Sequence, residues 1–204
     1  MQQYIPRKTP TASEIRILKG VIASLAANGY TKTSIGELAS LLGISKGLIH
    51  YHFSSKEVLF QETIAYIYAE ARRYMERQVW QTDNPWIQMQ TFITLSCQYY
   101  ADESQLIRAL QEIRANFKPR QTLSLAEVSS ANELKQLEDV IDAGQTLGIF
   151  RPFDAAFGAL TLRMSLNGAA QNILSAAEPK WTAVVCAAEL VEMFRRAWTV
   201  SGAE

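Results

Sequence analysis

The sequence predicts an all-α fold of about nine helices, in which a three-helix unit at the N-terminus precedes a larger helical domain. Strand signals are nearly absent, because no stretch alternates apolar and polar residues between turn residues. Apolar residues instead recur at helical spacing, as in Leu18, Ile22 and Leu25. Capping and turn residues punctuate these periodic stretches, which indicates many helices of moderate length.

The expected elements follow from this punctuation. Three S/T-x-x-E capping boxes precede apolar runs, at Thr11–Glu14, Ser34–Glu37 and Ser54–Glu57. The stretch from Pro119 to Leu125 is expected to be a loop. Helices are expected at 12–28, 34–42, 45–52, 55–81, 86–100, 103–116, 125–147, 153–176 and 179–199. We divide the chain into residues 1–54 and 55–204.

The composition is that of a globular protein, with 48% hydrophobic and 20% charged residues in a chain of 204. No apolar run approaches the roughly 18 to 20 residues that span a bilayer, and the N-terminus lacks the apolar region of a signal peptide. We therefore expect a cytoplasmic protein without a membrane partner. Cys97 and Cys186 each sit inside an apolar helical pattern, which favours two reduced core thiols over a metal site.

A net charge of zero conceals an asymmetry along the chain. Residues 1–56 hold seven Lys or Arg and two Glu, whereas residues 57–204 hold 13 basic and 18 acidic residues. A basic segment on an acidic body suggests that this segment meets a polyanion, although a solvated basic face without a partner fits the charge equally well.

Residues 34–53, SIGELASLLGISKGLIHYHF, have the layout of a helix-turn-helix. Ala39 is small where the two helices approach, Gly43 suits a turn with positive φ, and Ser45 can cap the second helix. The shared core of the pair is expected to be Ile35, Leu38, Leu42, Ile44 and Ile49. The alternative is a helical hairpin that only packs.

The second helix of this pair carries side chains suited to DNA. Lys46 can reach a phosphate or a guanine edge, Gly47 allows close backbone approach, and Lys56 begins the next helix, where a cation is disfavoured unless it meets an anion. His50 and His52 lie on different faces, so a shared metal is not expected, and one of them can equally have a core or capping role. The predicted DNA contacts are Thr33, Ser34, Ser45, Lys46, Gly47, Leu48, His50, Tyr51, His52 and Lys56.

Residues 29–59 resemble the DNA-binding segment of the tetracycline-repressor (TetR) family. The family pattern is matched at Gly29, Tyr30, Thr33, Ala39, Gly43, Ser45, Lys46, Gly47, His52, Phe53, Lys56, Glu57 and Leu59. His50 stands where the family usually has a phosphate-contacting Tyr, and Tyr51 follows it, so either aromatic side chain can be the one that contacts the backbone. The resemblance implies a homodimer on a palindromic operator, in most members a repressor that a small ligand in the C-terminal domain releases.

Small and apolar residues are frequent in the last two expected helices, 153–176 and 179–199, as helices that pack closely require. We expect these two helices to form a four-helix dimer interface, and the alternative is that they belong to the core of the monomer. The predicted interface residues are Phe157, Leu160, Ala187, Leu190, Phe194 and Trp198.

A ligand pocket is expected among the helices between residues 55 and 176, where aromatic residues are frequent. The candidates are Tyr68, Trp86, Gln90, Ile93, Cys97, Arg108, Phe117, Arg163 and Asn167. The polar members of this set can equally be surface or interface residues, and the sequence does not name the ligand.

These patterns favour a ligand-responsive transcriptional regulator, with double-stranded operator DNA, an unknown small molecule and a second copy of the chain as partners. An enzyme is disfavoured, because we find no nucleophile elbow, P-loop, dinucleotide fingerprint or metal-ligand set, and no cofactor is implied. A helical adaptor that uses the basic segment for protein contacts is the remaining alternative.

Overall fold

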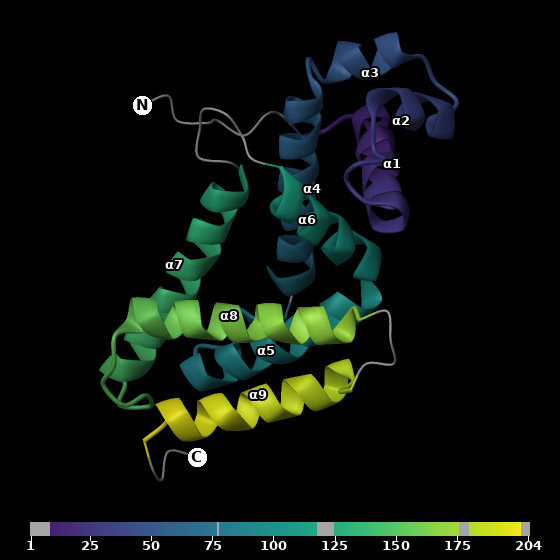
Figure 1. Cartoon of the computed structure of the whole chain (residues 1–204). Helices are drawn as coiled ribbons and strands as arrows, with labels where there is room; N and C mark the ends of the chain where they lie inside the picture. The colour runs from purple at the N-terminus through teal and green to yellow at the C-terminus, as the bar shows by residue number, and fades with distance from the viewer. Residues whose placement is uncertain (1–8, 77, 118–124, 176–179, 201–204) are drawn as a thin grey trace.

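The computed structural model describes residues 9–76, 78–117, 125–175 and 180–200, and for 125–130 it describes the backbone alone. Most of the expected loop from Pro119 lies outside these residues. The all-helical prediction is confirmed, and the described strand-like structure is one bridge between Phe150 and Thr199. The described residues form nine helices: α1 (Ala12–Asn28), α2 (Ile35–Leu42), α3 (Lys46–His52), α4 (Lys56–Glu76), α5 (Pro85–Asp102), α6 (Ser104–Asn116), α7 (Leu125–Thr146), α8 (Ala155–Ile173) and α9 (Ala183–Trp198) (Figure 1).

The first helices begin where capping chemistry predicts. In α1 and α2 both halves of the capping box form, with Thr11 and Ser34 accepting from the backbone N–H groups of Glu14 and Glu37. The third box was wrong. Ser55 caps α4, because its hydroxyl oxygen accepts from the N–H of Val58 at 3.1 Å, one residue later than the expected Ser54.

Helix α4 ends at Glu76 and not at residue 81. The N–H groups of Gln78 and Val79 both donate to the carbonyl oxygen of Met75, at 3.1 and 3.0 Å, and residues 78–80 form a turn. The side chain of Val79 is then buried in the core of the C-terminal half. An apolar residue in a turn can thus be buried as one in a helix would be. The apolar pattern therefore continues past Glu76, and a helix predicted from this pattern is too long.

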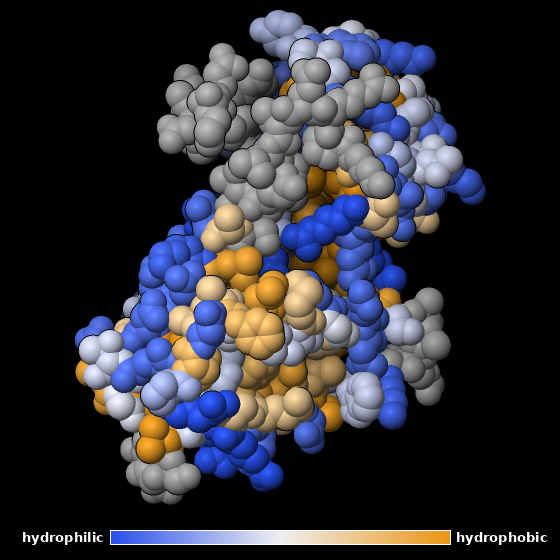
Figure 2. Space-filling view, turned by 60° about the vertical axis from the view of Figure 1, so that its left-hand side comes forward, coloured by the Kyte–Doolittle hydropathy of each residue, from blue (hydrophilic) through white to orange (hydrophobic). Residues whose placement is uncertain are grey.

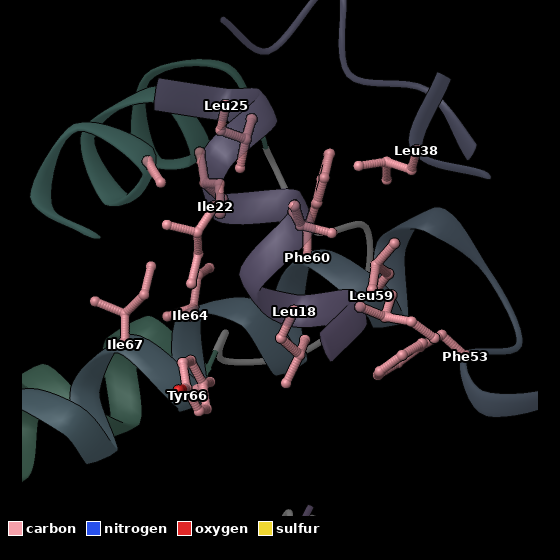
Figure 3. Close-up of a cluster of buried hydrophobic side chains, with 14 of the residues drawn as sticks. Leu18, Ile22, Leu25, Leu38, Phe53, Leu59, Phe60, Ile64, Tyr66 and Ile67 are labelled. Carbon is pink, nitrogen blue, oxygen red and sulfur yellow. The ribbon is translucent and has the colours of Figure 1, made fainter. Parts of the chain in front are cut away.

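One hydrophobic core joins the first three helices to α4 and α6. Figure 3 shows side chains of this cluster, among them Leu18 from α1, Leu38 from α2, and Phe60 from α4. Ile113 on α6 belongs to the same cluster. The core therefore crosses the expected boundary between residues 54 and 55, and the N-terminal unit completes its packing with the next helices.

A second core holds the C-terminal half together. Helix α5 lies between α8 and α9 (Figure 1), and α7 packs against α8. Both cysteines are buried, unpaired, in this core, as the sequence predicts. Among the described helices, none combines the length and the apolar character that crossing a membrane requires.

Candidate nucleic-acid interface

The turn between α2 and α3 has the geometry that the sequence predicts. Gly43 ends α2 with φ 63° and ψ 38°, in the left-handed region where glycine is strongly favoured. Ser45 then caps α3, and its side-chain oxygen accepts from the N–H of Leu48 at 3.1 Å. Ile49 is fully buried and anchors α3 on the N-terminal core. The two helices are thus held in the helix-turn-helix arrangement by a turn, a cap and one apolar contact.

Helix α3 presents most of its surface to solvent at one end of the molecule (Figure 1). Lys46, Gly47 and Leu48 are exposed along it, and so is His50. Tyr51 is 83% exposed, which is unusual for an aromatic side chain that has no partner surface. The predicted contacts Ser45 and Ser34 are exposed and half-buried respectively. An accessible α3 is the condition that insertion into the major groove requires.

Two of the predicted DNA contacts are placed differently. Thr33 was wrong as a contact, because it is fully buried and its hydroxyl bonds the Gly29 carbonyl oxygen at 2.9 Å and lies 3.0 Å from Ser24 Oγ. The imidazole of His52 is half-buried, with Nδ1 3.7 Å from Oε1 of Glu14. Of the two histidines, His52 therefore has the structural role that the sequence left open for one of them, and His50 faces outward.

The lysines that flank α3 pack back onto neighbouring elements. An ideal Cβ on Gly36 would stand 3.3 Å from Nζ of Lys46, so the missing side chain at Gly36 makes room for this ammonium on α2. Nζ of Lys56 lies 5.0 Å from the ring centre of Tyr30 and 5.1 Å from that of Phe60. These cation–π contacts hold the ammonium near the start of α2.

Positive charge gathers at the N-terminus of α2. Hydrogen bonds from the hydroxyl and the backbone N–H of Ser34 lower the pKa of Glu37, and attraction by Lys56 and Lys32 lowers this pKa further. Both lysines are thus close enough to act on the first turn of α2, whose backbone N–H groups carry partial positive charge and whose Glu37 carries a negative charge. Lys32 and Gly36 were not among the predicted contacts, although a lysine two residues before a helix cap was a usable signal. The arrangement suits a phosphate group.

Helices α4 to α8 enclose a cavity of about 110 Å³. Its wall is mostly apolar, with the aromatic Tyr68, Trp80 and Tyr100 among its side chains, and it holds one buried cation, Arg163. The guanidinium of Arg163, on α8, donates from Nη1 to Oε1 of Glu133, on α7. This combination of an apolar wall and a few polar groups is typical of a small-molecule site.

The cavity brings together two of the nine predicted pocket residues, Tyr68 and Arg163. Seven lie outside its wall. Ile93, Cys97 and the half-buried Trp86 pack in the C-terminal core, and Phe117 packs edge-on against Phe60 with ring centres 5.8 Å apart. The three that remain are the exposed Gln90 and the half-buried Arg108 and Asn167. Wall residues outside the candidate set include Phe92, Ser96, Tyr99 and Tyr100, which follow helical spacing on one face of α5; the three aromatic ones belong to the aromatic residues that predicted a pocket in this region.

The predicted dimer surface divides between α8 and α9. Phe157 and Leu160 on α8 are 70% and 43% exposed, and Met164, one turn further, is 54% exposed. These three side chains form an exposed apolar stripe along α8. Figure 2 shows a side of the molecule on which apolar residues gather and hydrophilic residues surround them. The residues predicted on α9 were largely wrong, because they face α5 and fill the core of the monomer: Ala187, Phe194 and Trp198 are buried, and Leu190 is half-buried.

An exposed second helix on a helix-turn-helix, joined to a helical body that encloses a cavity, defines a class of DNA-binding regulators. Residues 17–63 match the family model described as "Bacterial regulatory proteins, tetR family". The HTH-type transcriptional repressor NicS of Pseudomonas putida is 24% identical over 137 residues, which span 66% of this chain and 64% of NicS. The N-terminal part of the chain is therefore similar to the DNA-binding segment of TetR-family regulators, and the match to NicS spans less than two thirds of that relative's length.

Two solved structures extend the likeness to the whole fold. A TetR-family regulator from Rhodococcus sp., itself described as putative, superposes with a TM-score of 0.79 at 21% identity and covers 89% of this chain and 96% of its own. AibR, solved with isovaleryl coenzyme A and operator DNA, superposes with a TM-score of 0.73 at 18% identity and covers 89% and 97%. At these identities the likeness establishes the arrangement of helices and leaves the ligand open.

Proposed function

We propose that this protein is a ligand-responsive, DNA-binding transcriptional regulator, and specifically a repressor that leaves a palindromic operator when a small molecule occupies the cavity. The observation that carries this proposal is the exposure of α3, which the single buried Ile49 holds against the core while its outer side chains stand free. Residues 1–54 would read DNA, and residues 55–204 would sense the ligand and form the dimer. We place the protein in the cytoplasm, where DNA is accessible, and assign it no catalytic activity.

In the complex, α3 would lie in the major groove with Lys46, Gly47, Leu48, His50 and Tyr51 toward the DNA. The lysines at the start of α2 would neutralise phosphates on the flanking backbone. Neutralised phosphates release counterions, so binding should weaken steeply as salt increases.

The dimer would form on the exposed apolar stripe of α8. Phe157, Leu160 and Met164 are large side chains, and burial of each against a second copy would remove apolar area from water. A two-fold contact of this kind makes both partners present the same patch. It would also place two copies of α3 on successive turns of one DNA duplex, which accounts for a palindromic operator.

A route from the cavity to the DNA-binding unit runs through α6. Ile107 and Leu110 of α6 line the cavity, and Glu112 of the same helix accepts a hydrogen bond from the backbone N–H of Tyr30 at 2.9 Å. A ligand that binds more tightly when α6 occupies one position than another would shift α6 toward the favoured position. The hydrogen bond between Glu112 and Tyr30 would then carry this shift to the turn between α1 and α2. That turn carries Tyr30, whose ring supports Lys56.

The test is selection of bound fragments from the native genome, followed by fluorescence anisotropy over a salt series with the selected duplex. Tyr51→Ala should weaken specific binding by about 1–3 kcal/mol, the size of a good base or backbone contact. Trp181→Ala, at an exposed aromatic residue just before α9, is the control and should bind as the wild type does. If no fragment binds at low salt, a protein adaptor is favoured over a DNA-binding regulator. Binding whose affinity does not depend on the salt concentration would also contradict the proposal.

A further inference from the structure

We infer that the ligand of the cavity is a small organic acid, with an apolar body about the size of one ring and a carboxylate that meets Arg163. This inference rests on the proposed function, which makes the cavity the effector site, and adds the chemical class of the effector.

The size of the ligand follows from the volume of the cavity. A volume of about 110 Å³ is smaller than the roughly 150 Å³ in which an apolar protein cavity holds benzene, so one ring is the upper limit for the apolar body and side chains of the wall must shift to admit it. The apolar part of the wall includes the rings of Trp80, Phe92, Tyr99 and Tyr100, which accept a flat or compact apolar body. A chain of many carbons or a fused ring system would require the helices to separate.

The charge of the ligand follows from Arg163. This residue is 8% exposed, and an arginine stays protonated in any protein environment. Among the described side chains its partner is Glu133, which engages Nη1, so Nε and Nη2 can donate to another acceptor. The guanidinium fork matches the two oxygens of a carboxylate, and the dry surroundings strengthen such a pair.

The other groups that face the cavity do not favour a cation. Arg72 and Glu76 are exposed near the end of α4, which places them at the rim, and they balance each other in formal charge. Burial raises the pKa of Tyr100 to about 12, so its phenol stays neutral and can donate to an acid. Between the two members of the ion pair, the side chain of Arg163 is 9% exposed and that of Glu133 is 25% exposed, so the guanidinium is the more deeply buried charge of the wall.

The experiment is calorimetric titration of the full-length protein with matched probes. The panel is benzoate, phenylacetate and cyclohexanecarboxylate, each beside the amide and the amine of the same skeleton. At least one carboxylate should bind roughly 10- to 100-fold more tightly than its amide, as a hydrogen bond to a charged group provides, and the amine should bind more weakly still.

A double variant tests the role of the buried pair while keeping the site neutral. Arg163→Met with Glu133→Gln should bind acid and amide within about threefold of each other, the scatter expected when no specific contact distinguishes them. The matched control, Arg196→Met with Glu189→Gln on the exposed face of α9, should keep the preference for the acid. Far-ultraviolet circular dichroism confirms that both variants are folded, and thermal shift with the neutral amide confirms that the cavity of the double variant is intact.

The inference is overturned if amides or amines bind as well as the acids, if no carboxylate of the panel binds, or if the double variant keeps the preference. The proposed function fails separately: an acid that binds at the cavity and leaves operator affinity unchanged refutes ligand control and keeps the chemical class. If only a neutral compound releases the DNA, ligand control is supported and the proposed acid class is refuted.

Discussion

The hydrogen bond between Glu112 and the backbone of Tyr30 should be worth a measurable part of the stability. Oε2 of Glu112 accepts from this N–H at 2.9 Å, across 82 residues of sequence. The same oxygen lies 3.3 Å from the position of an ideal Cβ on Gly29, whose φ is 76°, so the chain passes close to the carboxylate there. Glu112→Ala removes the acceptor and leaves the N–H of Tyr30 to water.

The magnitude follows from burial. A hydrogen bond to a charged group contributes about 1.5–3 kcal/mol, and water can replace part of this because both residues are half-buried. We therefore expect the free energy of unfolding to fall by about 1–2 kcal/mol for Glu112→Ala and by less for Glu112→Gln, whose amide oxygen can still accept. In a chain of this length each kcal/mol lowers Tm by about 2–4 °C, so the alanine variant should melt about 2–8 °C below the wild type.

The assay is thermal unfolding followed by circular dichroism at one protein concentration, since dimer formation makes Tm depend on concentration. Glu189→Ala makes the same charge change on the exposed face of α9 and should leave Tm nearly unchanged. Equal Tm values for the Glu112→Ala and Glu189→Ala variants would refute the reasoning, and so would a glutamine variant that melts lower than the alanine variant.

Three further predictions follow from local geometry. Gly43→Ala should lower the free energy of unfolding in urea by about 1–2 kcal/mol, because φ is 63° and no atom within 4 Å of the new Cβ offers compensation; unchanged stability would contradict this. Burial raises the pKa of Cys97 to about 12 and also raises that of Cys186, so neither thiol should react with a disulfide reagent before the protein unfolds; rapid labelling of native protein would show that the burial is wrong. Hydrogen bonds from Ser34 lower the pKa of Glu37 below 4.5, so the stability from its charged form is complete above the unfolded pKa and is lost as pH falls through the folded value. The difference in Tm between wild type and Glu37→Gln should therefore shrink as the pH is lowered from about 6 to below about 3, and a difference that persists in acid would rule out the charged cap as its source.

The features that the sequence predicts well are those set by neighbouring residues. Gly43, Ser45 and the two capping boxes of α1 and α2 each depend on a few consecutive residues, and all are found where the pattern places them. The cap of α4 was misplaced by one residue because Ser54 and Ser55 are adjacent and only the fold decides which hydroxyl meets a free N–H.

Features that depend on distant segments were predicted less well. The pattern of α9 shows an apolar face, but it does not show that α5 covers that face, so Phe194 and Trp198 were assigned to a dimer contact. The cavity requires five helices to converge, and Trp80 and Arg163 are 83 residues apart in a chain whose sequence gives no sign of their proximity. Helical spacing identifies which side chains share a face, and only the packing of helices identifies what that face meets.

The core shared by α1, α2, α4 and α6 limits how this protein could exchange parts with similar proteins. A chimera joined after residue 54 would set the interior side chains Leu18 and Leu38 of one protein against foreign counterparts of Phe60 and Ile113. Under the proposed function, a change of operator specificity would therefore be reached more readily by substitutions on the outer surface of α3, which leave this interior intact, than by transplanting the whole N-terminal segment.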